Sequence, residues 1–219
     1  MNKILSFFKK YFDVFKAIIV LTVVCLVISA ALALTNHITK DKIAEMEKAS
    51  ASAAMEALIK NAEYELADLT DIKGLEDAEI YVATSNNETL GYIITTAAKG
   101  YGGDVTVMTA ISPDKKVIGV NILSAADETP GLGQNATKPE FYNQFLNKTL
   151  GVTVVKNGAK DNEINAVTGA TITSRAVTTA VNEALSQLDT YLNSITIPEI
   201  ETDVSPEEIL GTEVQYEEQ

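Results

Sequence analysis

A run of small and hydroxyl-bearing residues, Val167-Thr168-Gly169-Ala170-Thr171-Ile172-Thr173-Ser174-Arg175, precedes a segment with helical periodicity. Apolar residues recur there every three or four positions, at Val177, Ala180, Val181, Ala184, Leu185, Leu188, Tyr191 and Leu192. A helix that begins beside the run has first N–H groups without partners, and its dipole favours an anion there. Gly169 and Ala170 let a bulky group approach the backbone, and a threonine hydroxyl can accept a phosphoryl group as an ester. The run predicts a phosphate-binding turn or, more simply, a helix with Thr173 or Ser174 as its N-cap.

Two segments resemble the motifs of one known family. Thr168-Gly169-Ala170-Thr171 resembles the flavin-attachment motif of the FMN-binding domain family. Asp127-Glu128-Thr129-Pro130-Gly131-Leu132-Gly133 resembles the Glu-Thr-Pro-Gly-Leu-Gly loop of the same family, although Pro130 with Gly131 alone would indicate an ordinary surface turn. The whole chain resembles the G subunits of Rnf membrane complexes, which are related to the C subunit of the sodium-translocating NADH:quinone oxidoreductase.

The resemblance implies a covalently bound FMN whose phosphate is esterified to Thr171. It implies cofactor-binding roles around the phosphate for five neighbours, namely Thr168, Gly169, Ala170, Thr173 and Ser174. It also implies that a loop borders the isoalloxazine ring, with Glu128, Thr129, Leu132 and Gly133 as the matching positions. Tyr101, in a Gly-Tyr-Gly-Gly turn, is expected near the cofactor or, alternatively, as a half-buried packing residue. Six positions before the modified threonine the family pattern has an aspartate, whereas this chain has Asn165.

An apolar segment near the N-terminus predicts attachment to a membrane. The run from Ala17 to Leu34 contains no charged residue, so we expect a transmembrane helix at residues 17–35. The basic segment before it, residues 1–16, is expected in the cytoplasm, which puts the rest of the chain outside. A cleaved signal peptide ending at Ala31-Leu32-Ala33 is the alternative, but secretory h-regions span only roughly 7 to 15 residues.

The remaining chain predicts one α+β domain between a helical linker and a tail. The linker, residues 36–63, would hold the domain above the bilayer or pack on a partner subunit. Strand-like segments are at residues 79–84, 90–96, 104–111, 117–123 and 152–155, and a short helix is expected at residues 141–146. They predict an FMN-binding domain at residues 64–195 with a mainly antiparallel sheet and flanking helices. Residues 196–219 are rich in Asp and Glu, without Lys or Arg, and predict a disordered acidic tail.

Charge and missing residue types exclude several functions. The net charge of -13 disfavours nucleic-acid binding, because nucleic acids require basic patches. The chain has one Cys and one His, and Cys25 lies inside the predicted span while His37 lies just past it. The outer domain therefore has no Cys or His for a disulfide, a zinc, iron–sulfur or haem site, or a nucleophile–histidine pair. We predict no metal site and no catalytic residue, and redox function would require an organic cofactor.

The resemblance implies a single-pass membrane flavoprotein that relays electrons within an Rnf-type complex. Such a complex links ferredoxin and NAD⁺ to the transport of Na⁺ or H⁺, and one subunit is not expected to complete the reaction alone. The implied partners are the other subunits, the membrane and a flavin transferase. Two alternatives stay open. One is a membrane-tethered scaffold that takes no flavin, and the other is an FMN carrier in a quinone-linked or extracellular electron-transfer chain.

Overall fold

The computed structural model describes residues 2–196 of the chain, and for residues 2–14 only the backbone. Contacts divide the chain after Ala53 into two compact units. The predicted acidic tail, residues 196–219, lies outside the described residues except for Thr196.

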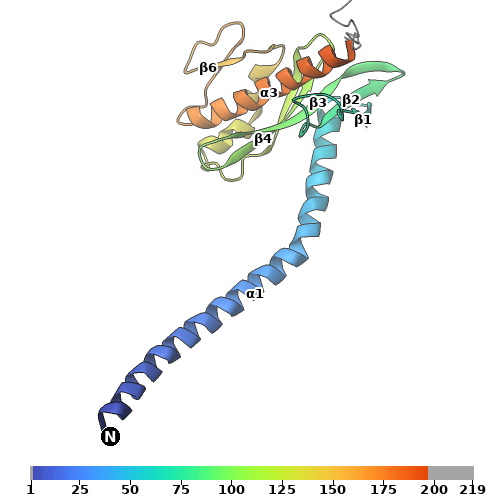
Figure 1. Cartoon of the computed structure of the whole chain (residues 1–219). Helices are drawn as coiled ribbons and strands as arrows, with labels where there is room; N and C mark the ends of the chain where they lie inside the picture. The colour runs from blue at the N-terminus through green and yellow to red at the C-terminus, as the bar shows by residue number, and fades with distance from the viewer. Residues whose placement is uncertain (1, 197–219) are drawn as a thin grey trace, which may run out of the picture. The chain divides into compact units, whose positions relative to one another are not determined.

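A single α-helix, α1, runs from Asn2 to Leu58 (Figure 1). From Phe15 onward it is long and apolar enough to cross a membrane, with a mean hydropathy of 3.0 in its most apolar window. The predicted span at residues 17–35 and most of the predicted linker at residues 36–63 therefore belong to one continuous helix. The helix ends at Leu58, and the first strand begins at Glu63, the last residue of the predicted linker.

The second unit is built on an antiparallel sheet of five strands in the order β1-β2-β3-β4-β5. The strands are β1 (Glu63–Leu66), β2 (Ile80–Ser85), β3 (Glu88–Lys99), β4 (Asp104–Ile111) and β5 (Val117–Ser124). Asn86 and Asn87 join β2 to β3 with positive φ angles of 51° and 69°, as a tight hairpin turn requires. Two short strands, β6 (Thr153–Val155) and β7 (Glu163–Asn165), pair in parallel as a separate sheet. The α+β prediction is confirmed, and the structure adds β1 and β7 to the predicted strands.

The long helix α3 (Thr171–Thr196) packs on one face of the sheet, across β3 and β4 (Figure 1). Its apolar stripe is fully or almost fully buried, at Val177, Ala180, Val181, Ala184, Leu185 and Leu188. The facing strand residues in the same core include Ile80, Ile94, Val105, Val107 and Ile111. At the centre of this contact Thr96 Oγ1 donates to Ala180 O at 2.8 Å. Truncation of the fully buried Leu188 to alanine is expected to cost about 2–5 kcal/mol.

The last residues of α1 cover the opposite face of the sheet, within the second unit. Ala54 and Met55 are buried, and so is Ile59, which directly follows the helix. A Cβ at Gly119 would lie 2.6 Å from Leu58 Cδ2, so a glycine in β5 is what allows the helix to approach this closely. The second unit is therefore layered, with α3 on one face of the sheet and the end of α1 on the other.

The connection from β5 to β6 carries the remaining helical turns. It contains the 3₁₀ turn η1 (Gly133–Thr137), the short helix α2 (Pro139–Tyr142) and the 3₁₀ turn η2 (Asn143–Phe145). The helix predicted at residues 141–146 is thus two consecutive turns, of which the α-helical one begins earlier at a proline. Phe141 and Phe145 are buried in an edge-to-face contact with ring centroids 5.8 Å apart. This packing anchors the backbone of the two turns, which also carry Gln144.

Candidate functional site

Three loops far apart in the sequence meet beside the first turn of α3. They are the turn at residues 100–103, the loop at residues 128–133 and the loop at residues 166–170, which we call the attachment loop. Together they form a hollow of about 570 Å³, lined by Tyr101, Glu128, Thr129, Leu132, Gly133, Gly169, Ala170, Thr171, Ile172 and Thr173. The structure therefore brings together all the predicted cofactor-binding residues except Thr168 and Ser174.

Helix α3 begins at Thr171, so this threonine lies in its first turn. Its side chain is half-buried and lines the hollow. Within the described chain the N–H groups of Thr171, Ile172 and Thr173 donate to no carbonyl or side chain. Three open donors at a helix start, next to a hydroxyl, form a setting that suits a phosphate. Gly169, with φ of 78°, provides the left-handed turn that leads into this helix.

Thr173 and Ser174 lie inside the helix, so the alternative that either one is its N-cap is wrong. Thr173 is 1% exposed and its hydroxyl donates to Glu128 Oε2 at 2.6 Å. The Ser174 hydroxyl is fully buried, donates to Ala170 O and accepts the N–H of Val167. Both hydroxyls are therefore engaged within the protein, and this does not support the expectation that they hold a phosphate. Thr171 is the half-buried hydroxyl left at the hollow.

Glu128 is a buried carboxylate that connects the three sides of the hollow. It is 2% exposed, and its Oε1 accepts the backbone N–H of Tyr101 at 2.7 Å and that of Gly102 at 3.1 Å. Burial by itself raises the pKa of this carboxyl, but the Thr173 hydroxyl and these N–H groups outweigh it and hold the pKa below its usual range. The Glu128 oxygens thus tie the loop at residues 128–133 to the turn at residues 100–103 and to the first turn of α3.

The positions of the glycines around Glu128 have no room for a larger residue, because the carboxylate occupies the space that a side chain would need. A Cβ at Gly100 would collide with Glu128 Oε1, and one at Gly133 would collide with Glu128 Oε2. The Gly133 Cβ would also lie 2.9 Å from Thr173 Oγ1. These positions are therefore closed to larger residues as long as the carboxylate stays in place.

Apolar side chains form an exposed rim around the hollow. Tyr101 is 71% exposed, Leu132 44% and Ile172 51%. The half-buried packing role considered for Tyr101 is therefore wrong. Ile172 was missed from the sequence, and the signal that could have found it is its position outside the buried stripe of α3. Exposed apolar residues around a polar turn provide a surface for a flat ring system.

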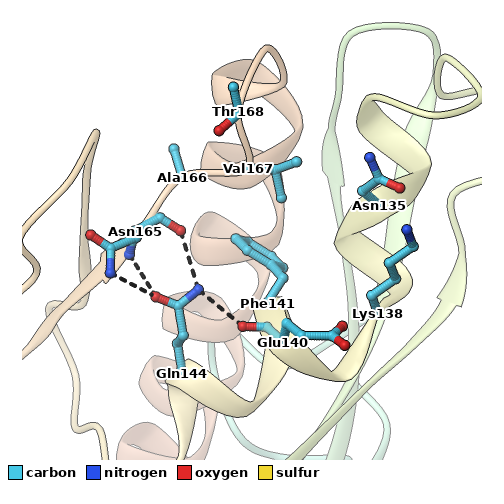
Figure 2. A pocket seen from close by; sticks show the side chains of 9 residues that line it. All are labelled: Asn135, Lys138, Glu140, Phe141, Gln144, Asn165, Ala166, Val167 and Thr168. Atoms are coloured by element: carbon cyan, nitrogen blue, oxygen red, sulfur yellow. Dashed lines mark hydrogen bonds between the residues drawn. The ribbon is translucent and has the colours of Figure 1, made fainter.

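A second cavity, of about 450 Å³, borders the upstream part of the attachment loop (Figure 2). Thr168 lines this cavity and not the hollow, together with Asn135, Lys138, Glu140, Phe141, Gln144, Asn165, Ala166 and Val167. Asn165, at the position of the family aspartate, is thus separated from the hollow and forms hydrogen bonds with Gln144. Among the described residues no group of three or more His, Cys, Asp or Glu side chains could hold a metal ion.

The chain matches known proteins over most of its length. The FMN-binding domain family matches residues 100–186, a range that includes all three loops of the hollow. The G subunit of the proton-translocating ferredoxin:NAD(+) oxidoreductase complex of Clostridium ljungdahlii is 37% identical over 78% of this chain and 89% of its own. The G subunit of the Na(+)-translocating complex of Acetobacterium woodii is 39% identical over 78% of this chain and 90% of its own.

The fold also matches a solved structure. Shewanella oneidensis NqrC superposes with a TM-score of 0.51 and 24% identity, over 63% of this chain and 70% of that one. This likeness concerns the arrangement of sheet and helices. The identity to the G subunits over more than two thirds of both chains shows the family: the chain belongs to the G-subunit family of ion-translocating oxidoreductase complexes, and it contains an FMN-binding domain.

Proposed function

We propose that this protein relays electrons through an FMN attached covalently to Thr171, as the G subunit of an ion-translocating ferredoxin:NAD⁺ oxidoreductase complex. The observation that carries the proposal is the setting of Thr171, a half-buried hydroxyl beside three open N–H groups in an FMN-binding domain. The names of the relatives support the rest, because they are G subunits of complexes that translocate protons or Na⁺.

The residues at the hollow fit the parts of FMN. The phosphate would be held at the start of α3 by the N–H groups of Ile172 and Thr173, where the helix dipole favours negative charge. The ring would lie against the apolar rim of Tyr101, Leu132 and Ile172. When bound, the flavin supplies the redox chemistry, while the protein supplies position and electrostatics.

Attachment requires an activated flavin donor. In the reaction we propose, a P–O bond forms between Thr171 Oγ1 and the flavin phosphorus, and the donor's own P–O bond to its leaving group breaks. The proton of the hydroxyl passes to a base. A flavin dinucleotide fulfils this role, because its pyrophosphate releases a nucleoside monophosphate, whereas FMN itself would have to release water. A separate flavin transferase would catalyse the step, and Thr171 would remain an attachment point without turning over.

The topology that we propose follows the distribution of charge. Residues 1–16 would lie in the cytoplasm, residues 17–35 would cross the membrane and the domain at residues 64–195 would lie outside, connected by residues 36–63. The lysines before the apolar run and the length of α1 support this arrangement. A covalent bond suits such a place, since a cofactor lost outside the cell is not recovered.

Intact mass and in-gel fluorescence of the denatured protein, co-expressed with a flavin transferase, test the attachment. We expect an FMN-sized adduct on the wild type and none on Thr171→Ala, because the variant lacks the ester oxygen. Thr179→Ala, which removes an exposed hydroxyl on the same helix, is the matched control and should keep the adduct. Full labelling of Thr171→Ala would show that another residue is modified. An unlabelled wild type beside a labelled reference substrate would favour the scaffold alternative.

A further inference from the structure

Gln144 forms hydrogen bonds with the backbone of β7 as a neighbouring strand would. Its Oε1 accepts the N–H of Asn165 at 2.8 Å, and its Nε2 donates to Asn165 O at 3.3 Å (Figure 2). Strand β6 pairs with β7, and Gln144 forms a second set of hydrogen bonds with Asn165, the last residue of β7. Gln144 is half-buried, and its neighbours in the same two turns, Phe141 and Phe145, are buried in the core and anchor the backbone that carries it.

The side chain of Asn165 completes this pair of amides. Its Nδ2 donates to the same Gln144 Oε1 at 3.3 Å, and its Oδ1 accepts the N–H of Ala159 at 3.1 Å. The backbone of residue 165 fixes which end of the Gln144 amide is the oxygen, because N–H needs an acceptor and C=O needs a donor. The side chain at residue 165 must therefore present a donor to Gln144 Oε1. Asparagine does so, whereas an ionised aspartate would place an oxygen there.

Asn165 directly precedes the attachment loop, which is held at both ends. At the upstream end Ala166 N–H donates to Val155 O at 2.8 Å, immediately beyond the Gln144 bridge. The next N–H, of Val167, donates to the buried Ser174 hydroxyl of α3 at 2.9 Å, and at the downstream end Ala170 N–H donates to Val167 O at 2.9 Å. These contacts fix the attachment loop, and the position of Thr171, which directly follows the loop, depends on them.

We propose that Gln144 is a positioning residue for flavin attachment, and that it makes asparagine the fitting residue at position 165 in this chain. The proposal rests on the proposed function, since it concerns the labelling of Thr171. It reverses what the motif alone suggests, because restoring the family aspartate is expected to slow labelling. Without the amide pair, fewer molecules hold the attachment loop in the geometry that a transferase can use, and the rate falls with that fraction.

Two readouts on the full-length protein test this role. One is the initial rate of adduct formation with limiting transferase and a flavin dinucleotide donor, and the other is amide hydrogen exchange at Asn165. We expect Asn165→Asp to slow labelling by about tenfold, the effect of one lost hydrogen bond and one unpaired polar group. Gln144→Leu, which removes three hydrogen bonds to Asn165, should slow it at least as much. Exchange at residue 165 should accelerate with them. Asn143→Ala, which removes the neighbouring exposed amide, is the control and should change neither.

The pH dependence of the labelling rate distinguishes a positioning role from a general loss of structure. At low pH the carboxyl introduced by Asn165→Asp becomes protonated and can donate to Gln144 Oε1, so its labelling rate relative to the wild type should rise as the pH falls. Gln144→Leu should show no such recovery. If Gln144→Leu does not fold, Gln144→Glu retains the acceptor and should show a smaller loss.

Distinct outcomes separate this proposal from the proposed function. If Asn165→Asp labels at least as fast as the wild type, the proposal is overturned. Wild-type rates for all variants, despite faster exchange, would overturn it as well. An unlabelled wild type would instead refute the attachment to Thr171, whatever the exchange data show for Asn165.

Discussion

The residues around Thr171 are held from two sides by networks of different chemistry. On the side of the hollow, the buried carboxylate of Glu128 collects the Thr173 hydroxyl and two backbone N–H groups. On the side of the second cavity, the neutral amides of Gln144 and Asn165 pair with each other and with the backbone. The carboxylate network is tight and ionisable, whereas the amide network is neutral. The two should therefore respond differently to a larger side chain and to pH.

Filling the space around the carboxylate should have the largest effect. Gly133→Val places carbon against Glu128 Oε2 and Thr173 Oγ1, and we expect the free energy of unfolding to fall by about 3 kcal/mol. Urea denaturation measures the change. Gly131→Ala is the matched control, because a Cβ there meets nothing and only the positive φ of 76° opposes it, at about 1 kcal/mol. Equal losses for both variants would mean that the carboxylate can move away.

Removing the charge of Glu128 should have an intermediate effect that depends on pH. Glu128→Gln replaces charge-assisted hydrogen bonds by neutral ones, at a cost of about 1–2 kcal/mol near neutral pH. Because the pKa of Glu128 is lowered in the folded protein, its contribution is complete above the unfolded value of about 4.3 and is lost as the pH falls through the folded value. The difference between wild type and variant should therefore shrink in acid.

Denaturation curves of both proteins from neutral to acid pH give this difference directly. Glu140→Gln, an exposed carboxylate beside the amide network, is the control and should stay within about 0.5 kcal/mol of the wild type. A constant difference between wild type and Glu128→Gln at every pH would contradict the ionisation argument.

The exposed rim should contribute least to stability. Ile172→Ser removes a side chain that is already 51% exposed, so the free energy of unfolding should change by less than about 0.5 kcal/mol. If the ring lies against this residue, the visible absorption of the attached flavin should nevertheless shift. Ile195→Ser, with 59% exposure at the far end of the same helix, should leave both quantities unchanged. An unshifted spectrum for Ile172→Ser would place the ring elsewhere.

Periodicity and turn residues were sufficient to predict the central strands and α3, because these elements are long and bury a regular stripe. The short strands β1 and β7 lack such a stripe, and they exist only because a partner strand is nearby. For the same reason, no local signal reveals that Glu128 faces inward or that Gln144 bridges to Asn165. The motifs identified which residues surround the hollow. They did not show that the hydroxyls of Thr173 and Ser174 are already occupied.

The hollow is assembled from contacts that span long stretches of chain. Thr173 and Glu128 are 45 residues apart, and the Thr96 to Ala180 bond joins residues 84 apart. Closing such loops costs more entropy than forming local contacts does, so we expect these bonds to form late in folding. Before they form, Thr171 is one threonine among many on an open chain. An enzyme that recognises the folded surroundings of Thr171 would consequently modify only molecules that have completed folding. Attached flavin would then distinguish folded molecules from unfolded ones.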